Sequence, residues 1–157
     1  MRLWRITNRD VYLEQSYVYL ASFAARLAAM LLLTLRGTPT LYQGDEIGIG
    51  KVDIPPGRIR DPQDLRQPGL GIGRDRSRTP MPWDASDHAG FSTVEPWLPL
   101  NDDWRTRNVH AQEDDPASLL SLYRMLLAMR RAHPALYVGS FHHRRCHAGS
   151  ARLRATA

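Results

Sequence analysis

An α/β fold is predicted for this chain of 157 residues, because helix-forming runs alternate with a short apolar strand. Residues 21–35 are rich in Ala, Leu and Met, which are strong helix formers. Residues 40–43 follow a glycine turn and Pro39, and they are predicted as a short buried strand. A helix, a glycine turn and a short strand together make the αβ step of a parallel α/β fold.

The first helix is expected to bury one face and to end at Gly37, where a left-handed cap is easiest. Four large apolar residues recur along it at helical spacing: Phe23, Leu27, Met30 and Leu31. Its apolar run is shorter than the roughly 20 residues that a bilayer requires. We therefore predict a buried helix and no membrane partner.

Residues 48–112 form a long irregular stretch that is rich in Gly, Pro, Arg and Asp. Such a stretch inside a compact domain is often functional. Disordered segments are poor in aromatic residues, whereas this stretch holds four: Trp83, Phe91, Trp97 and Trp104. We expect an ordered excursion that folds over a site.

A second helix is predicted to start with Asp115 as its N-cap and Pro116 at its first helical position. Arg130 and Arg131 suit the negative C-terminal end of this helix, and Pro134 ends it. Residues 135–141 could begin a further strand. The predicted apolar stripe runs along Leu119, Leu122, Tyr123, Leu126 and either Met129 or Arg130.

The two ends of the chain differ from the rest. Residues 1–20 fit a strand or a helix equally well, and residues 142–157 have no apolar periodicity and no acid. We predict a disordered basic tail there, or a stretch translated out of register. Its histidines and Cys146 lack the spacing of a zinc site, so no metal is predicted. The organisation is an uncertain segment at 1–20, a domain at 21–141 and a tail at 142–157.

Composition favours an uncharged ligand. The chain is 43% hydrophobic and 24% charged, with a formal net charge of +5, which is ordinary for a globular protein. The basic excess lies at the two ends rather than in a folded patch, so no nucleic-acid partner is predicted. The single cysteine and the lack of a recognisable secretory signal lead us to predict a cytoplasmic location.

Several motifs follow one another in an order that is recognisable. They include GTPTLYQGDEIG at 37–48, IPPGRIRDPQ at 54–63, IGRDRSRTPMPWD at 72–84 and the helical run from residue 115. Over residues 24–141 the chain resembles the alpha-amylase family of glycoside hydrolases, and within it the α-glucosidase or oligo-1,6-glucosidase type. The resemblance implies a (β/α)8 barrel followed by a β-sandwich domain.

A complete barrel of this kind takes about 250 residues, so the chain is expected to hold its last helix–strand–loop–helix portion. The C-terminal β-domain would be essentially missing. Retaining glycosidases use two carboxyl groups about 5 Å apart, and the resemblance implies that both follow strands this chain lacks. We therefore expect the chain alone to be inactive, and no cofactor is implied. Asp10, in Asn8-Arg9-Asp10, either is the family's transition-state-stabilising carboxylate or matches it by chance.

Asp45 and Glu46 are adjacent residues, so their side chains point in different directions and cannot flank one bond. The resemblance implies that they support loops at the barrel mouth.

Arg78 and Arg74 are candidate substrate-binding residues, since the resemblance places their segment beside the leaving-group sugar. A guanidinium group donates several directed hydrogen bonds to hydroxyls. The alternative is an arginine that pairs with Asp75 or Asp84 and stiffens the loop. Trp83 could stack on a sugar or pack within its own loop.

The predicted function is that of an α-glucosidase-type fragment. The intact relative would act on oligosaccharides or other α-linked glucosides in carbohydrate metabolism, by double displacement. Two alternatives stay open: a fragment of a trehalose or isomaltulose synthase-type transglycosylase, and a non-catalytic carbohydrate-binding or interaction module. The apolar faces that a partial barrel leaves exposed also predict self-association.

Overall fold

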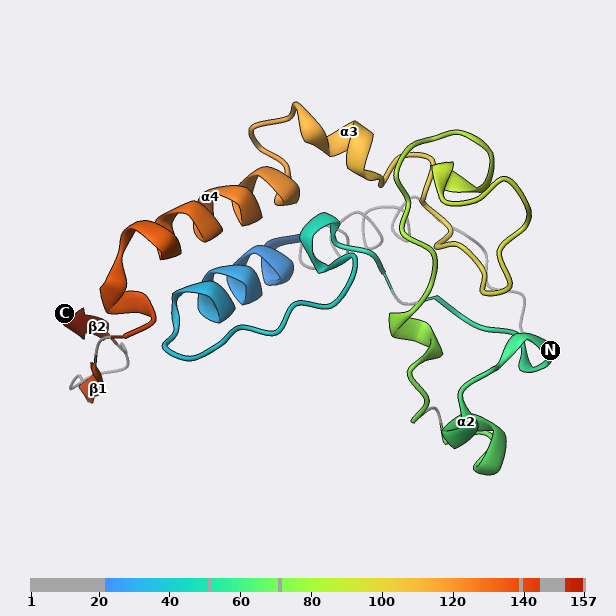
Figure 1. Cartoon of the computed structure of the whole chain (residues 1–157), viewed down its shortest axis with the longest axis horizontal. Coiled ribbons are helices and arrows are strands. Elements are labelled where there is room, and N and C mark those ends of the chain that lie inside the picture. The colour runs from blue at the N-terminus through green and yellow to red at the C-terminus, as the bar shows by residue number, and fades with distance from the viewer. Residues whose placement is uncertain (1–21, 51, 71, 139, 145–151, 157) are drawn as a thin grey trace, which may run out of the picture. The chain divides into compact units, whose positions relative to one another are not determined.

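The computed structural model describes five stretches of the chain, and Asp10 lies outside them: 22–50, 52–70, 72–138, 140–144 and 152–156 (Figure 1). The chain divides into two compact units. One unit contains residues 1–38 and 129–157, and the other contains residues 39–128. None of the helices in the described stretches is long and apolar enough to cross a membrane.

The predicted first helix is confirmed, since residues 22–34 are helical. The helix was predicted to be buried, but among its described residues the buried ones are Ala29 and Leu33, and its apolar faces are exposed as expected of a partial barrel. The predicted stripe is exposed, at 66% for Phe23 and 44–48% for the other three residues, Leu27, Met30 and Leu31. This run is apolar almost all round, so its periodicity could not decide which face packs.

The end of this helix is held by Arg130, a buried residue that lies almost 100 positions later in the chain. Its guanidinium donates hydrogen bonds of 2.9 Å to the carbonyls of Leu33 and Leu35 and a further one to the carbonyl of Gly37. Arg130 therefore caps the C-terminus of the first helix, whereas we had expected it to serve its own helix.

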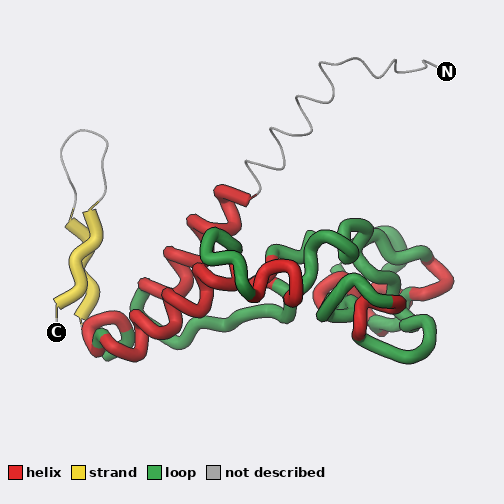
Figure 2. Tube along the Cα trace, turned by 90° about the horizontal axis from the view of Figure 1, so that it is seen from above, coloured by secondary structure: helices red, strands yellow, loops and turns green. Residues whose placement is uncertain are grey.

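The tail is not disordered throughout. Strand β1 (Ser140–Arg144) pairs with strand β2 (Arg152–Thr156) in an antiparallel hairpin, drawn in yellow in Figure 2. Ser140 lies opposite Thr156, and Arg144 lies opposite Arg152. The prediction of disorder was wrong for these residues, because a two-stranded ladder is made by backbone groups that any sequence supplies.

The second unit, residues 39–128, consists mainly of loops and short helical turns (Figure 2). The strand predicted at residues 40–43 is absent, because this segment pairs with no strand within the described residues. A parallel strand exists only through hydrogen bonds to its neighbours. Gly44, with a φ of 91°, instead turns the chain into the short 3₁₀ helix Asp45–Ile47.

The long excursion is ordered, as predicted. It holds two short α-helices, α2 (Pro62–Arg66) and α3 (Val109–Glu113), and several 3₁₀ turns. One apolar cluster joins three segments of the chain: Ile47, Met81 and Leu120, with Ile49 and Val109 packed against them.

Helix α4 (Leu119–Ala132) begins later than predicted. Its N-cap is Ser118, whose hydroxyl accepts a 3.0 Å hydrogen bond from the backbone N–H of Ser121. Asp115 accepts instead from the N–H of Ala117, in the turn before the helix. The buried stripe of α4 runs through Leu120, Tyr123, Leu126 and Arg130, close to the predicted one.

Candidate functional site

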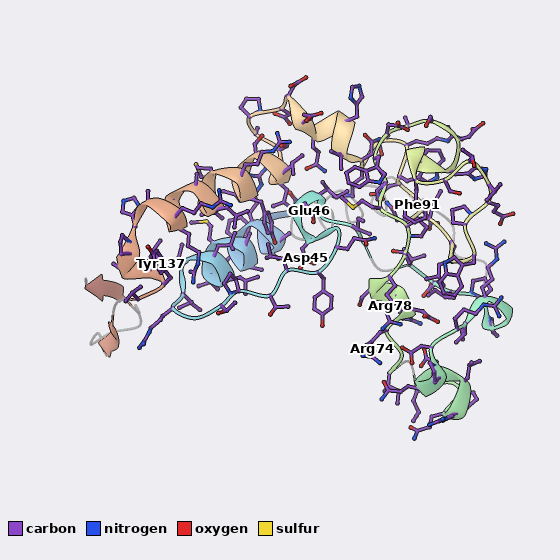
Figure 3. The ribbon with its side chains drawn as sticks, in the orientation of Figure 1. Asp45, Glu46, Arg74, Arg78, Phe91 and Tyr137 are labelled. Carbon is purple, nitrogen blue, oxygen red and sulfur yellow. The ribbon has the colours of Figure 1, made fainter. Side chains whose placement is uncertain are left out.

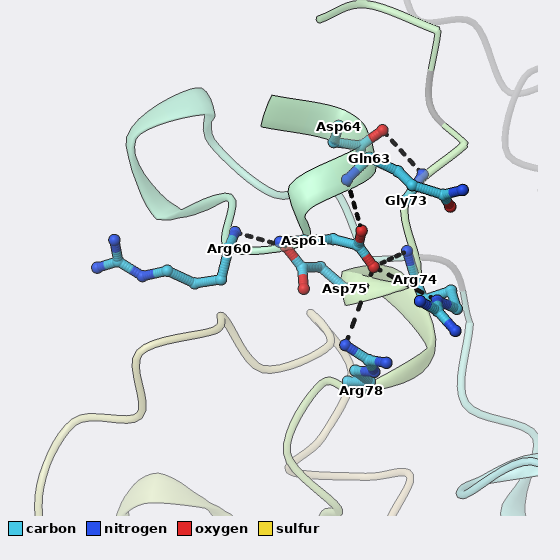
Figure 4. Close-up of polar contacts among 8 residues, drawn as sticks. All are labelled: Arg60, Asp61, Gln63, Asp64, Gly73, Arg74, Asp75 and Arg78. Atoms are coloured by element: carbon cyan, nitrogen blue, oxygen red, sulfur yellow. Dashed lines mark hydrogen bonds and ion pairs between the residues drawn. The ribbon is translucent and has the colours of Figure 1, made fainter. Parts of the chain in front are cut away.

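A buried carboxylate, Asp61, lies at the centre of a polar network that joins two distant parts of the loop (Figure 4). Its Oδ1 caps helix α2 by accepting from the N–H of Gln63 at 2.8 Å. Its Oδ2 accepts from the N–H of Arg74 at 3.1 Å. The same oxygen lies 3.5 Å from Nε of Arg74 and 3.9 Å from Nη1 of Arg78.

These partners lower the pKa of Asp61 below its ordinary value. The backbone N–H groups of Gln63 and Arg74 contribute most, burial opposes them, and the charges of Arg74 and Arg78 add to the lowering. Asp61 is therefore an ionised anchor at neutral pH.

Asp75 completes the network from the opposite side. It is also buried, and its Oδ2 accepts from the N–H of Arg60 at 2.6 Å and from the N–H of Asp61 at 2.8 Å. Each of the two aspartates thus binds the backbone beside the other. Asp64 adds a third tie to the N–H of Gly73, at 2.8 Å.

Arg74 and Arg78 pair with Asp61, not with Asp75 or Asp84 as our alternative prediction proposed. Their side chains keep 65% and 54% of their surface exposed. Each guanidinium therefore has one edge beside a fixed carboxylate and further N–H donors that reach solvent. Asp61 was missed from the sequence, although an aspartate before a proline that opens a helix is an N-cap signal.

Asp45 and Glu46 lie on the turn that follows residue 42, apart from the arginine segment (Figure 3). Asp45 accepts from the N–H of Tyr42 and Glu46 from the N–H of Gly44, both at 2.9 Å. Each carboxylate therefore binds the backbone of its own turn. They line different hollows of the surface, as expected for neighbours in sequence.

The hollow beside Asp45 is polar and has a volume of about 270 Å³. Its walls include Tyr42, Gln43, Arg76 and Thr79, and the amide of Gln43 donates to the carbonyl of Thr79 at 2.8 Å. Such a mixture of donors and acceptors suits a ligand rich in hydroxyl groups. Arg74 and Arg78 do not line this hollow.

The hollow beside Glu46 is more apolar, with a volume of about 350 Å³. It is lined by Leu41, Leu120 and Tyr123, among others. Burial, and then the charges of Asp45 and Glu46, raise the pKa of Tyr123. No three metal-binding side chains gather in the part of the chain that the structure describes.

Comparison with known proteins shows which family this chain resembles in sequence and fold. Residues 6–139 match the model of the alpha-amylase catalytic domain. The chain is 39% identical over 140 residues to a probable alpha-glucosidase of Rhizobium meliloti, covering 87% of this chain and 25% of that protein. An oligo-1,6-glucosidase of Parageobacillus thermoglucosidasius is 34% identical, with 75% and 24% covered.

Among solved structures, the alpha-glucosyl transfer enzyme XgtA superposes with a TM-score of 0.77 at 36% identity. The match covers 87% of this chain and 25% of that enzyme. The chain thus spans about a quarter of the length of the proteins that it matches. It belongs to the alpha-amylase family and holds part of that family's (β/α)8 catalytic domain.

Proposed function

We propose that this chain is part of an α-glucosidase-type hydrolase and forms one wall of its substrate site, with Arg78 and Arg74 donating to sugar hydroxyls. The observation that carries the proposal is that two exposed guanidinium groups lie beside the buried Asp61, which also holds the backbone of Arg74. The intact enzyme would cleave α-linked glucosides by the retaining double displacement of the family.

Fixed donors favour this role because binding costs less when a side chain is already ordered. The backbone of Arg74 is held by Asp61 and that of Gly73 by Asp64. The two arginine side chains therefore extend from a segment whose backbone is held at Gly73 and Arg74. Asp45 and Glu46, which bind their own turn, fit the supporting role that we expected of them.

The described carboxylates of this network are poorly suited to catalysis. A general acid needs a raised pKa so that it stays protonated at working pH, whereas the pKa of Asp61 is lowered. Asp75 is occupied by two backbone N–H groups. We therefore propose that the nucleophile and the acid come from outside this segment, and that the chain alone releases no nitrophenol from a nitrophenyl α-glucoside.

A chimera tests the proposal. The matching 140 residues of the Rhizobium meliloti protein would be replaced by those of this chain, and hydrolysis of maltose, isomaltose and sucrose would be followed. We expect a folded chimera to be active and Arg78→Ala to lower kcat/KM at least tenfold. Arg58→Ala is the matched control, because Arg58 is similarly exposed and pairs with Glu95 on the surface.

Two results would contradict the proposal. One is a folded chimera that is inactive on every α-glucoside, and the other is an Arg78→Ala variant that matches Arg58→Ala in kcat/KM. Arg74→Ala, measured beside them, separates the contributions of the two arginines.

A second candidate function, glucosyl transfer, is favoured by the superposition on a glucosyl-transfer enzyme. Hydrolysis and transfer differ in whether water or a second sugar accepts the glucosyl unit. The same chimera, incubated with sucrose, distinguishes them by the ratio of disaccharide isomers to free glucose.

A further inference from the structure

Trp83 keeps 51% of its surface exposed although the residues on either side of it are largely buried or half-buried. Its side chain lines an open cavity of about 490 Å³, together with Asp84, Val109, His110 and Glu113. This cavity shares no lining residue with the polar hollow beside Asp45. A volume of this size suits one or two sugar rings, since small-ligand pockets span roughly 300–1,000 Å³.

The backbone of Trp83 is fixed from both sides. Its N–H donates to the carbonyl of Ala89 at 2.8 Å, and its carbonyl accepts from the N–H of His110 at 2.9 Å. His88 and Ala89 both have positive φ values, 53° and 59°. Left-handed conformations are costly for residues other than glycine and gather at functional sites. The turn therefore holds the backbone from which the indole extends.

Polar groups surround the exposed ring. Oδ1 of Asp84 accepts from both the N–H, at 2.8 Å, and the hydroxyl of Ser86. These bonds lower the pKa of Asp84, so the carboxylate is ionised at neutral pH. Within the described residues its Oδ2 accepts no hydrogen bond. Glu113 and His110 line the same cavity; Oε1 of Glu113 pairs with Arg124 at 3.4 Å, which leaves its other oxygen as an acceptor.

The other two tryptophans of the excursion do not combine an exposed ring with a place in this cavity. The guanidinium of Arg105 covers the ring of Trp104 at 4.2 Å. Trp97 is 59% exposed but lies outside the cavity. Only Trp83, among these three, combines an open ring with acidic and imidazole groups around one cavity.

We propose that Trp83, Asp84, His110 and Glu113 form a second carbohydrate-binding surface that holds a glucose unit of an α-linked oligosaccharide. The apolar C–H face of the pyranose lies on the indole ring, as apolar surfaces do on aromatic faces. The hydroxyls at its edge donate to the carboxylates of Asp84 and Glu113. The inference does not rest on the proposed catalytic role, because it needs no nucleophile and no acid.

The test uses the purified chain with maltotriose and isomaltotriose as probes, measured by isothermal titration calorimetry. We expect saturable binding that Trp83→Ala weakens at least tenfold and that Trp83→Phe largely preserves. Trp97→Ala, which removes an equally exposed tryptophan outside the cavity, should leave the Kd within twofold. Circular dichroism confirms that each variant keeps the parent's helix content.

Saturation-transfer NMR on the unmodified chain makes the test independent of mutant folding. When the aromatic protons of the chain are irradiated, saturation should be transferred most strongly to the protons on one face of the pyranose ring. The absence of saturable binding, equal weakening by Trp83→Ala and Trp97→Ala, or no aromatic transfer would each overturn the proposal. Arg58→Ala, tested in the same titrations, should bind like the parent, because Arg58 is a surface arginine that does not line this cavity.

Discussion

Replacing the buried Arg130 by alanine is expected to destabilise the first unit strongly, because one guanidinium holds three backbone carbonyls. The carbonyl of Leu33 is buried, and loss of its charged donor costs about 2 kcal/mol. The carbonyls of Leu35 and Gly37 are only partly buried, so water replaces the donor and each loss costs about 0.5 kcal/mol. The total is about 3 kcal/mol, a large part of the stability of a typical domain.

Two further substitutions sharpen the prediction. Relative to Arg130→Ala, Arg130→Lys should recover only about 1 kcal/mol of stability, because an ammonium group lacks the planar fork that reaches several carbonyls at once. Arg131→Ala is the matched control, since Arg131 neighbours Arg130 in sequence but is exposed. Its removal should change the free energy of unfolding by less than about 0.5 kcal/mol.

Urea unfolding followed by circular dichroism at the helical band provides the measurement. We expect the order of midpoints to be parent, Arg131→Ala, Arg130→Lys and then Arg130→Ala, with unchanged slopes. If Arg130→Ala unfolds at the same urea concentration as Arg131→Ala, the helix end is not held by this side chain and the reasoning fails.

Three further predictions concern the second unit, and urea midpoints check each of them. Gly44→Ala should destabilise it by about 1–3 kcal/mol, because the φ of 91° disfavours any side chain and a Cβ would overlap Ile49. Ser118→Ala should lower the free energy of unfolding by about 1 kcal/mol, and Asp115→Ala by clearly less, since Ser118 is the N-cap of α4. Asp61→Asn should remove part of the pH dependence of the free energy of unfolding. The pKa of Asp61 is lower in the folded state, so its carboxylate stabilises the fold above its unfolded pKa, near 4. That contribution is lost as the pH falls through the folded pKa.

Local signals in the sequence predicted the two long helices well. The run of Ala and Leu predicted the helix over residues 22–34. The predicted stripe of α4 was correct at Tyr123 and Leu126 but missed the buried Leu120. Helix propensity and apolar periodicity depend on residues close together in sequence, so they can be read without knowing the rest of the fold. The start of α4 was misplaced because Asp115 and Ser118 both carry capping side chains, and only the structure shows which one reaches the N3 position.

Features that depend on distant partners were not predicted. The strand at residues 40–43 needed neighbouring strands, and none pairs with it within the described residues. The role of Arg130 needed the carbonyls of a helix far away in sequence. Asp61 needed the backbone of Arg74, which no local pattern couples to it. In each case the missing information was which groups meet across long separations.

The candidate site is stabilised mainly by carboxylate-to-backbone bonds, and this links its stability to its proposed function. Asp61 and Asp75 are buried, and each binds a backbone N–H group in the segment that contains the other. The carboxylate of Asp61 also lies beside the guanidiniums of Arg74 and Arg78. A change that neutralises Asp61 should therefore loosen the loop and affect both arginines together, so the sugar affinity of the proposed site and the stability of the fold should decline together as the pH falls.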